Sequence, residues 1–338
     1  MTLVVSRILK NSTLLFLILS FYSCSNNGDY PFIKGATMGT TYSIKYSNSS
    51  VSLSQVQTEI DNILSSINNQ MSTYINNSEI SIFNKTSKDV KHTVSSDFYY
   101  VVDKSKYYYD LSNGLFDITV EPLSELWGFY DKEFKLPKKE SIDSIKDQIG
   151  FDKIKLSGHN TMIKSNDQIE ISLNAIAKGY AVDKIANYFD NNNVKNYMVE
   201  IGGEVKTKGF NSLGQKWKIG LSSFELNVGN VFEYISINDG ALATSGDYRN
   251  FFVYEDISYS HVINPITGYP TKNNVVSATV IADNCIDADA LATILNIMEP
   301  EESIRLIKDL SNVECVIVER VKEGFDYYYS NNMKKYFN

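Results

Sequence analysis

The stretch ISLNAIAKGYAVDKIANYF, residues 171 to 189, predicts a helix from Ala175 through Phe189. Lys178 precedes Gly179 and Tyr180 near the start of that helix. The first amides of a helix and a lysine ammonium both favour negative charge, so this segment suits a phosphate. An ordinary solvated lysine is the alternative. Neither a Walker pattern nor a GxGxxG motif after a strand occurs in the sequence.

Helices and strands intermix on both sides of this segment without a regular βαβ rhythm. One earlier helix carries apolar residues from Val56 to Ile67 at helical spacing with Ser54 as its cap, and a second covers 96–111. Strands are predicted at 40–46, 197–201, 216–221, 231–237, 251–254, 275–282 and 314–319. This order favours an α+β fold with a mixed, largely antiparallel sheet and packed helices.

DADALATILNIM, residues 287 to 298, begins a further amphipathic helix with an unusual polar pair. Asp289 and Thr293 are four positions apart, so they share one helix face and could offer two oxygens to a hard cation. The alternative is structural: a carboxylate in the first turn that favours the helix dipole, and a hydroxyl bonded back to a carbonyl.

Other segments combine turn residues with polar groups that suit a ligand or a catalyst. EIGGEV (200–205) and GALATSGDYRNFF (240–252) are rich in glycine and small residues, which either admit a ligand to the backbone or make ordinary turns. In SHVINPITGYPT (260–271), His261 is a candidate general base or a structural histidine. Met38 and Asp117 are further candidates for a ligand site. The structural alternative is core filling for Met38 and a turn or cap carboxylate for Asp117.

The N-terminus has the pattern of an export signal. Arg7 and Lys10 precede an apolar run at 14–19 that is too short to span a bilayer, and Ser23 stands directly before Cys24. The Ser-Cys step resembles a bacterial lipoprotein processing site. We therefore expect a signal peptide at 1–23, a tether at 24–31 lipidated on Cys24, and one domain at 32–338, exported and anchored to a membrane on its periplasmic or cell-surface side.

Charge and the scarce metal-binding residue types exclude several functional classes. The net charge is −8, and removing residues 1–23 takes away Arg7 and Lys10, which gives −10; an acidic chain argues against nucleic acid as a partner. Besides Cys24, only Cys285 and Cys315 remain, too few for a disulfide framework, and whether they pair is open. The three histidines form no zinc-binding pattern in the sequence.

Eight segments, in their order along the chain, closely resemble the ApbE family, the FAD:protein FMN transferases. They are MGTTY (38–42), MSTY (71–74), FDITVEPL (116–123), LNAIAKGYAVD (173–183), EIGGE (200–204), ATSGDYRNFF (243–252), SHVINPITGYP (260–270) and ADALAT (288–293). The resemblance covers about residues 32 to 320. It implies an ApbE-like, T-fold-like architecture and an enzyme that moves FMN from FAD onto a threonine or serine of a target flavoprotein, releasing AMP with the help of Mg²⁺.

The resemblance to the family assigns roles to the residues of this sequence that stand at matching positions. Asp289, Thr293 and the main-chain carbonyl of Ala175 correspond to magnesium ligands, and His261 to the proposed base. The positions that correspond to FAD contacts are Met38, Tyr74, Leu115, Phe116, Asp117, Ser172, Lys178 and Ile263. The chain departs from the family twice, with Ser172 and Asn264 where aspartate is usual, and Ser172 leaves its FAD contact in doubt.

Two other functions remain as alternatives to the transferase. One is a lipoprotein that binds FAD without turnover, and the other is a magnesium-dependent hydrolase that gives FMN and AMP. The family points to an exported or membrane-bound flavoprotein as the partner, reached from a lipid anchor. The sequence selects neither the target, nor the membrane, nor the oligomeric state.

Overall fold

The computed structural model describes residues 29–47, 49–129, 134–222, 231–246, 251–254, 257–271 and 274–337. The predicted signal peptide and Cys24 lie outside these residues. The helices are α1 (Leu53–Met71), α2 (Glu79–Lys85), α3 (Ser96–Leu111), α4 (Glu121–Leu126), α5 (Lys139–Lys146), α6 (Ala177–Asn191), α7 (Cys285–Ile297) and α8 (Pro300–Lys308), with 3-10 turns η1 (Phe151–Lys153) and η2 (Met333–Tyr336). No helix of this described part has the length and apolar character needed to cross a membrane.

An eight-stranded sheet forms the centre of the fold, in the order β1-β2-β6-β7-β10-β15-β16-β17, and every pairing in it is antiparallel. Its strands are β1 (Phe32–Thr37), β2 (Thr40–Tyr46), β6 (Tyr197–Ile201), β7 (Glu204–Lys208), β10 (Gly240–Gly246), β15 (Val275–Ala282), β16 (Glu314–Val321) and β17 (Gly324–Tyr329). All eight residues of β15 are buried, because both faces of the sheet are covered at its centre.

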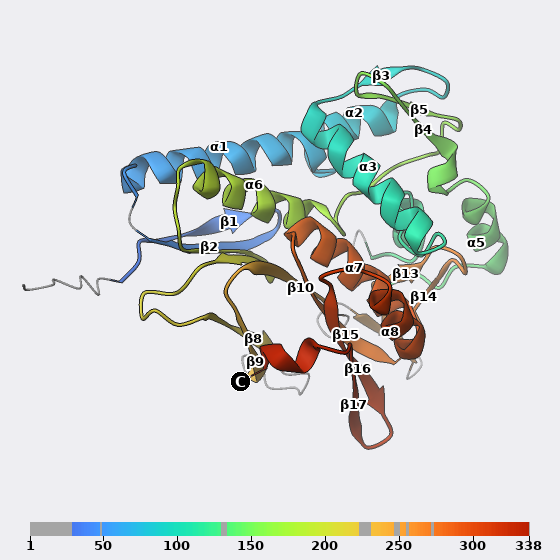
Figure 1. The fold of residues 1–338 in the computed structure, drawn as a ribbon. Helices are drawn as coiled ribbons and strands as arrows, with labels where there is room; N and C mark the ends of the chain where they lie inside the picture. The colour runs from blue at the N-terminus through green and yellow to red at the C-terminus, as the bar shows by residue number, and fades with distance from the viewer. Residues whose placement is uncertain are drawn as a thin grey trace, which may run out of the picture.

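Alternating side chains of the central strands serve two different cores. Ala278 and Val280 of β15 belong to the larger core, which lies under α1, α6 and α7. Val276 and Ile281 of the same strand face a second core, which also includes Ile235 of strand β9 (Val231–Ile237). The pairing of β15 with β16 shifts register between Val275 and Ser277, so Val276 faces the second core although Ala278 and Val280 face the first. Beyond this bulge the side chains alternate between the two layers. Figure 1 shows α1, α6 and α7 crossing one face of the sheet.

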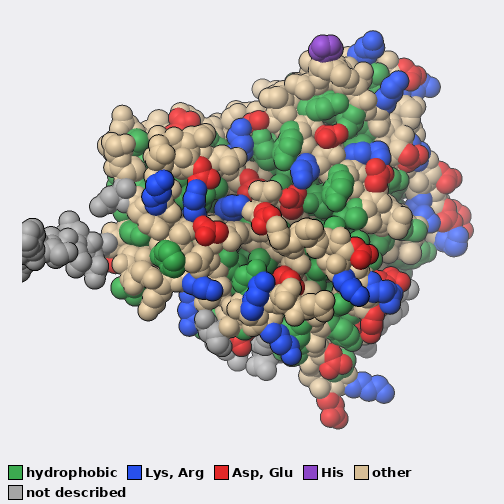
Figure 2. All heavy atoms as spheres, viewed as in Figure 1, with side chains coloured by type: hydrophobic (Ala, Val, Ile, Leu, Met, Phe, Trp, Pro, Cys, Tyr) green, Lys and Arg blue, Asp and Glu red, His purple; other side chains and the backbone are tan. Residues whose placement is uncertain are grey.

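Smaller sheets complete the fold around this centre. They are β3 (His92–Thr93) with β5 (Thr161–Lys164) and β4 (Ile154–Ser157), β8 (Trp217–Ser222) with β9 (Val231–Ile237), β11 (Phe251–Tyr254) with β12 (Ile257–Ser260), and β13 (Ile263–Asn264) with β14 (Tyr269–Pro270). The lobe of α2, α5 and β3–β5 lies at one end of the sheet-and-helix body (Figure 1). Acidic and basic side chains alternate over the face shown in Figure 2.

Trp127, at the end of α4, connects this helix to the β13–β14 hairpin. Its indole Nε1 donates a 3.0 Å hydrogen bond to the carbonyl of Gly268, and its ring packs against Tyr259 and Tyr269. A third core, with Leu123, Ile142 and Ile263 among its members, surrounds the indole. Because His261 directly precedes this hairpin, the Trp127 contacts help to fix its backbone.

The α+β fold class is confirmed, and most predicted strands match the structure closely. The predicted cap at Ser54 is wrong: Ser52 caps α1, where its hydroxyl accepts from the Gln55 amide and its own backbone amide donates to Gln55 Oε1. The helix predicted from Ala175 begins at Ala177, because residues 174–176 form a turn. The helix of the DADALATILNIM segment begins two residues earlier, at Cys285.

Candidate functional site

A cavity of about 630 Å³ gathers most of the residues singled out in the sequence. Its walls come from the 115–124 segment, the turn before α6, the start of β7, the ends of β10 and β15, the 261–265 segment and α7. The predicted site residues that line it are Leu115, Phe116, Asp117, Ser172, Ala175, Lys178, His261, Ile263, Asp289 and Thr293. Segments that are distant in sequence therefore meet at one site, as the order of motifs predicted.

Asp289 lies in the second turn of α7, where it is 5% exposed. Its Oδ2 accepts a 2.9 Å hydrogen bond from the backbone amide of Gly179, and its Oδ1 is 3.8 Å from the Lys178 ammonium. The acidic residue of the first turn is Asp287, so the alternative of a first-turn carboxylate does not describe Asp289. Thr293, one turn further, lines the same cavity.

The contact between α6 and α7 depends on a missing side chain at position 179. A Cβ atom on Gly179 would lie 2.5 Å from the Cys285 carbonyl oxygen and 2.8 Å from the Asp289 Cβ. Both neighbours belong to helix α7, so neither is the far end of a flexible side chain. Glycine therefore lets the two helices approach closely enough for the Gly179 amide to reach the carboxylate.

The same hydrogen bond changes what the Ala175 carbonyl does. In a regular helix the amide of residue 179 would donate to the carbonyl of residue 175, but here it donates to Asp289. Within the described residues, no backbone amide donates to the Ala175 oxygen. This carbonyl, which lines the cavity, is therefore available to a ligand.

Lys178 and Glu204 form a partly buried ion pair that the sequence analysis did not identify. Lys178 Nζ lies 2.8 Å from Glu204 Oε1. Burial alone would lower the pKa of Lys178, but the carboxylates of Asp289 and Glu204 outweigh that effect and hold it above its ordinary value. Burial raises the pKa of Glu204, and Lys178 offsets only part of the increase. The sequence analysis singled out the EIGGEV segment as glycine-rich, but it gave no reason to expect a role for Glu204 in particular.

The oxygen atoms around this pair fit a hard divalent cation that is shared with a phosphate. Asp289 offers a carboxylate, Thr293 a hydroxyl and Ala175 a carbonyl, while Glu204 Oε2 is buried without a hydrogen-bond partner among the described residues. That part of the chain contains no cluster of three or more histidine, cysteine or acidic residues. Mg²⁺ suits such a set, since it takes one or two carboxylates and completes its octahedron with water and substrate phosphate.

The 115–124 segment adds two further carboxyl groups to the cavity lining, Asp117 and Glu121. Asp117 Oδ1 accepts from the amide and the hydroxyl of Thr119, at 2.9 and 2.7 Å, so the turn interpretation of Asp117 holds although the residue also lines the cavity. Burial raises its pKa. Glu121, at the start of α4, lines the cavity beside Ser172, and burial raises its pKa to about 7.

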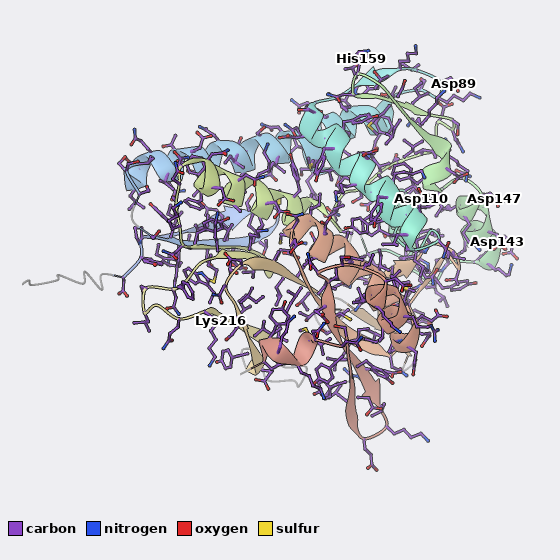
Figure 3. The ribbon with its side chains drawn as sticks, in the orientation of Figure 1. Asp89, Asp110, Asp143, Asp147, His159 and Lys216 are labelled. Atoms are coloured by element: carbon purple, nitrogen blue, oxygen red, sulfur yellow. The ribbon has the colours of Figure 1, made fainter. Side chains whose placement is uncertain are left out.

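His261 is half-buried and lines the cavity directly before β13. The other two histidines are remote from it: His92 lies on β3, and Figure 3 shows His159 at the outer tip of the lobe of α2, α5 and β3–β5. Cys285 and Cys315 are both buried and are not joined by a disulfide.

Met38 and Tyr74 are the two predicted FAD contacts that do not line the cavity. Met38 occupies the β1–β2 turn with a φ of 50° and packs partly against the larger core. Tyr74 follows α1, and its side chain is 72% exposed. Their assignment stays a prediction, as does that of Cys24, which lies outside the described residues.

Comparisons with known proteins agree on one family. The model of the ApbE family matches residues 38–317. The FAD:protein FMN transferase of Vibrio cholerae is 36% identical over 94% of this chain and 96% of its own length, and that of Haemophilus influenzae is 33% identical over 94% and 95%. The solved flavin transferase ApbE from Vibrio cholerae superposes with a TM-score of 0.84, covering 91% of this chain and 99% of its own.

Proposed function

This chain belongs to the ApbE family and is a FAD:protein FMN transferase, and we propose that it transfers FMN to a threonine or serine hydroxyl of a target flavoprotein. In this reaction the acceptor oxygen attacks the phosphorus of the FMN half of FAD. The bridging P–O bond breaks and its electron pair leaves with AMP. A phosphoester then joins FMN to the target, and the acceptor proton needs a base.

The observation that carries the proposal is the charge arrangement around Lys178. The ammonium lies between Glu204 and Asp289, at 2.8 and 3.8 Å, on the wall of a cavity large enough for a nucleotide. Its raised pKa keeps it cationic at neutral pH. A cation held in this way favours the anionic pyrophosphate of FAD and stabilises the charge that moves onto AMP as the bond breaks.

The proposal includes magnesium, with Asp289, Thr293 and the Ala175 carbonyl as the groups that would hold it. When bound, the ion would supply positive charge against the pyrophosphate oxygens. The Gly179 amide fixes one oxygen of Asp289, which leaves the other oriented on the Lys178 side. The protein thus contributes few ligands and holds them in place before the substrate arrives.

His261 is the residue that we propose as proton acceptor. It lines the cavity with Lys178 and Asp289, and the β13–β14 hairpin behind it is fixed through Trp127 and Gly268. An imidazole is suited to accept a proton near neutral pH. If water takes the place of the hydroxyl, the same steps release FMN and AMP, which makes hydrolysis of FAD the second candidate activity.

We further propose that the enzyme is exported and held at a membrane through a lipid on Cys24, where it acts on an exported or membrane-bound flavoprotein. The support is the arrangement of Arg7, Lys10, the apolar run and the Ser-Cys step.

The test uses Asp289→Asn, which keeps an oxygen for the Gly179 amide but removes the charge. With FAD, Mg²⁺ and a target that carries the acceptor residue, we expect flavinylation to fall by about 100-fold. We also expect FAD with Mg²⁺ to raise the melting temperature of the wild type but not of the variant. Mass spectrometry of the target and thermal melting measure the two effects.

Asp287→Asn is the matched control on the same helix, since its carboxylate contacts Lys104 and Tyr108 instead of the cavity. This control is expected to keep the response to Mg²⁺. Flavinylation by Asp289→Asn at the wild-type rate would show that the metal assignment is wrong. Equal AMP release with and without the target would favour hydrolysis.

A further inference from the structure

Glu121 is a carboxylate on the cavity wall that none of the assigned roles uses. It occupies the first position of α4, immediately after the segment that contains Leu115, Phe116 and Asp117. No ion pair of this residue occurs within the described part of the chain. Its pKa of about 7 reflects burial first, then repulsion from Glu125 and Glu170, with the Ser172 hydroxyl acting in the opposite direction.

Ser172 is the neighbour that shows where this carboxylate faces. Its amide donates to the Ile118 carbonyl at 2.8 Å, which holds residue 172 against the 115–121 segment. The Ser172 Oγ is buried and has no hydrogen-bond partner that meets the usual geometric criteria among the described residues. It nevertheless lies close enough to Glu121 to lower the pKa of that carboxyl group. Both side chains line the cavity, so both are accessible to the same ligand.

Partly burying this carboxylate costs folding energy, because no cation of the described residues compensates for its lost hydration. Such a group is expected where a bound molecule supplies the missing partners. The partner cannot be the pyrophosphate, since a carboxylate and a phosphate repel each other, and Lys178 on another element of the cavity already provides for the phosphate. The other parts of FAD, its adenosine and riboflavin moieties, are neutral and carry hydroxyl and amino groups.

We propose that Glu121, together with Ser172, binds hydroxyl or amino donors in one neutral half of FAD and so contributes to its recognition. The carboxylate accepts one or two hydrogen bonds from the ligand, and the serine hydroxyl accepts or donates a further one. The inference rests on the proposed function, because it takes FAD as the occupant of the cavity. It makes Glu121 a substrate-binding residue that takes no part in proton transfer.

The experiment compares the full chain with Glu121→Gln in the flavinylation assay, with AMP and FMN as competing ligands. We expect the KM for FAD to rise about tenfold, while kcat stays within about twofold. The inhibition constant of one fragment should rise by a similar factor and that of the other should stay unchanged. A change for AMP places Glu121 at the adenosine half, and a change for FMN places it at the riboflavin half; either result supports the inference.

Thermal melting of the free protein separates binding from folding. Because the variant removes an uncompensated buried charge, Glu121→Gln is expected to melt at a higher temperature than the wild type at pH 8. Weaker FAD binding in a more stable protein is an outcome that damage to the fold does not produce. Glu121→Asp, which keeps the charge on a shorter side chain, should recover part of the affinity.

Glu140→Gln is the matched control, since it removes an exposed carboxylate from the first turn of α5, outside the cavity lining, and its KM for FAD should equal that of the wild type. The inference is overturned if Glu121→Gln has an unchanged KM and unchanged inhibition constants, or if it melts below the wild type. Failure of the proposed function looks different: the wild type itself then gives no flavinylated target.

Discussion

At the scale of single residues, the site depends on the absence of a side chain at Gly179 as much as on any functional group. The Gly179 amide holds Asp289, and the same amide leaves the Ala175 carbonyl without its usual helical donor. One glycine thus prepares two oxygens for a cation. The α7 backbone lies so close to Gly179 that even a methyl group there is expected to displace both Asp289 and the Ala175 carbonyl.

Gly179→Ala is therefore expected to reduce both stability and activity. The new methyl would meet the Cys285 carbonyl at 2.5 Å, and separating two packed helices costs about 1–3 kcal/mol. We expect the free energy of unfolding, measured by urea denaturation, to fall by that amount, and the response of the melting temperature to FAD with Mg²⁺ to be lost.

Gly158→Ala is the matched control, because a Cβ atom at that position meets nothing within 4 Å. This variant should behave as the wild type in both measurements. If Gly179→Ala also keeps the wild-type midpoint of denaturation and the wild-type response to Mg²⁺, the close approach of α6 and α7 is not what positions Asp289.

At the scale of elements, α6 determines where α7 begins. Asp183 of α6 accepts hydrogen bonds from the amides of Cys285 and Ile286, both at 2.9 Å, so it caps α7 from a neighbouring helix. Asn284 occupies the cap position itself but makes no side-chain cap hydrogen bond. The start of α7, and with it the position of Asp289, is therefore fixed by α6 at two points.

Asp183→Ala removes this cap and is expected to destabilise the protein by about 1–2 kcal/mol. It should also lower the flavinylation rate, because the first turn of α7 precedes Asp289 directly. Urea denaturation and the rate with saturating FAD measure the two effects. Asp103→Ala, which removes an exposed carboxylate from α3, controls for the loss of charge. A wild-type midpoint for Asp183→Ala would show that other groups hold the start of α7.

The sequence predicted elements more completely than it predicted the polar contacts between them. Strand β2 and helix α1 were recognised because alternation and helical spacing depend on one element at a time. The pairing of Lys178 with Glu204, and of Asp183 with the start of α7, joins residues 26 and 102 positions apart. Spacing along the chain carries no information about such contacts, so Glu204, Glu121 and Asp183 became visible only in three dimensions.

At the scale of the whole molecule, much of the cavity wall is built on the central sheet and its helical layer. The cavity takes walls from β7, β10, β15, α6 and α7, which share the same antiparallel sheet or its helical layer. Because the described core begins at Ile33 and the cavity lining at Leu115, we expect the catalytic domain and the proposed lipid anchor to be separable. Anchoring then determines where the enzyme meets its target, while the folded domain determines the chemistry.

Cys24→Ala tests this separation. We expect the wild type expressed in a bacterial host to sediment with the membranes and to incorporate labelled fatty acid, and the variant to lose the label and leave the membrane fraction. Its rate of flavinylation on a soluble target should equal that of the wild type, since the described cavity lining begins at Leu115, far along the chain from Cys24. Cys315→Ala, at a buried cysteine, should keep the label.

A Cys24→Ala chain that retains labelled lipid would exclude Cys24 as the anchor. Equal rates with a soluble target, but a slower rate for the variant with a membrane-bound target, would show that the anchor acts by raising the local concentration of the enzyme.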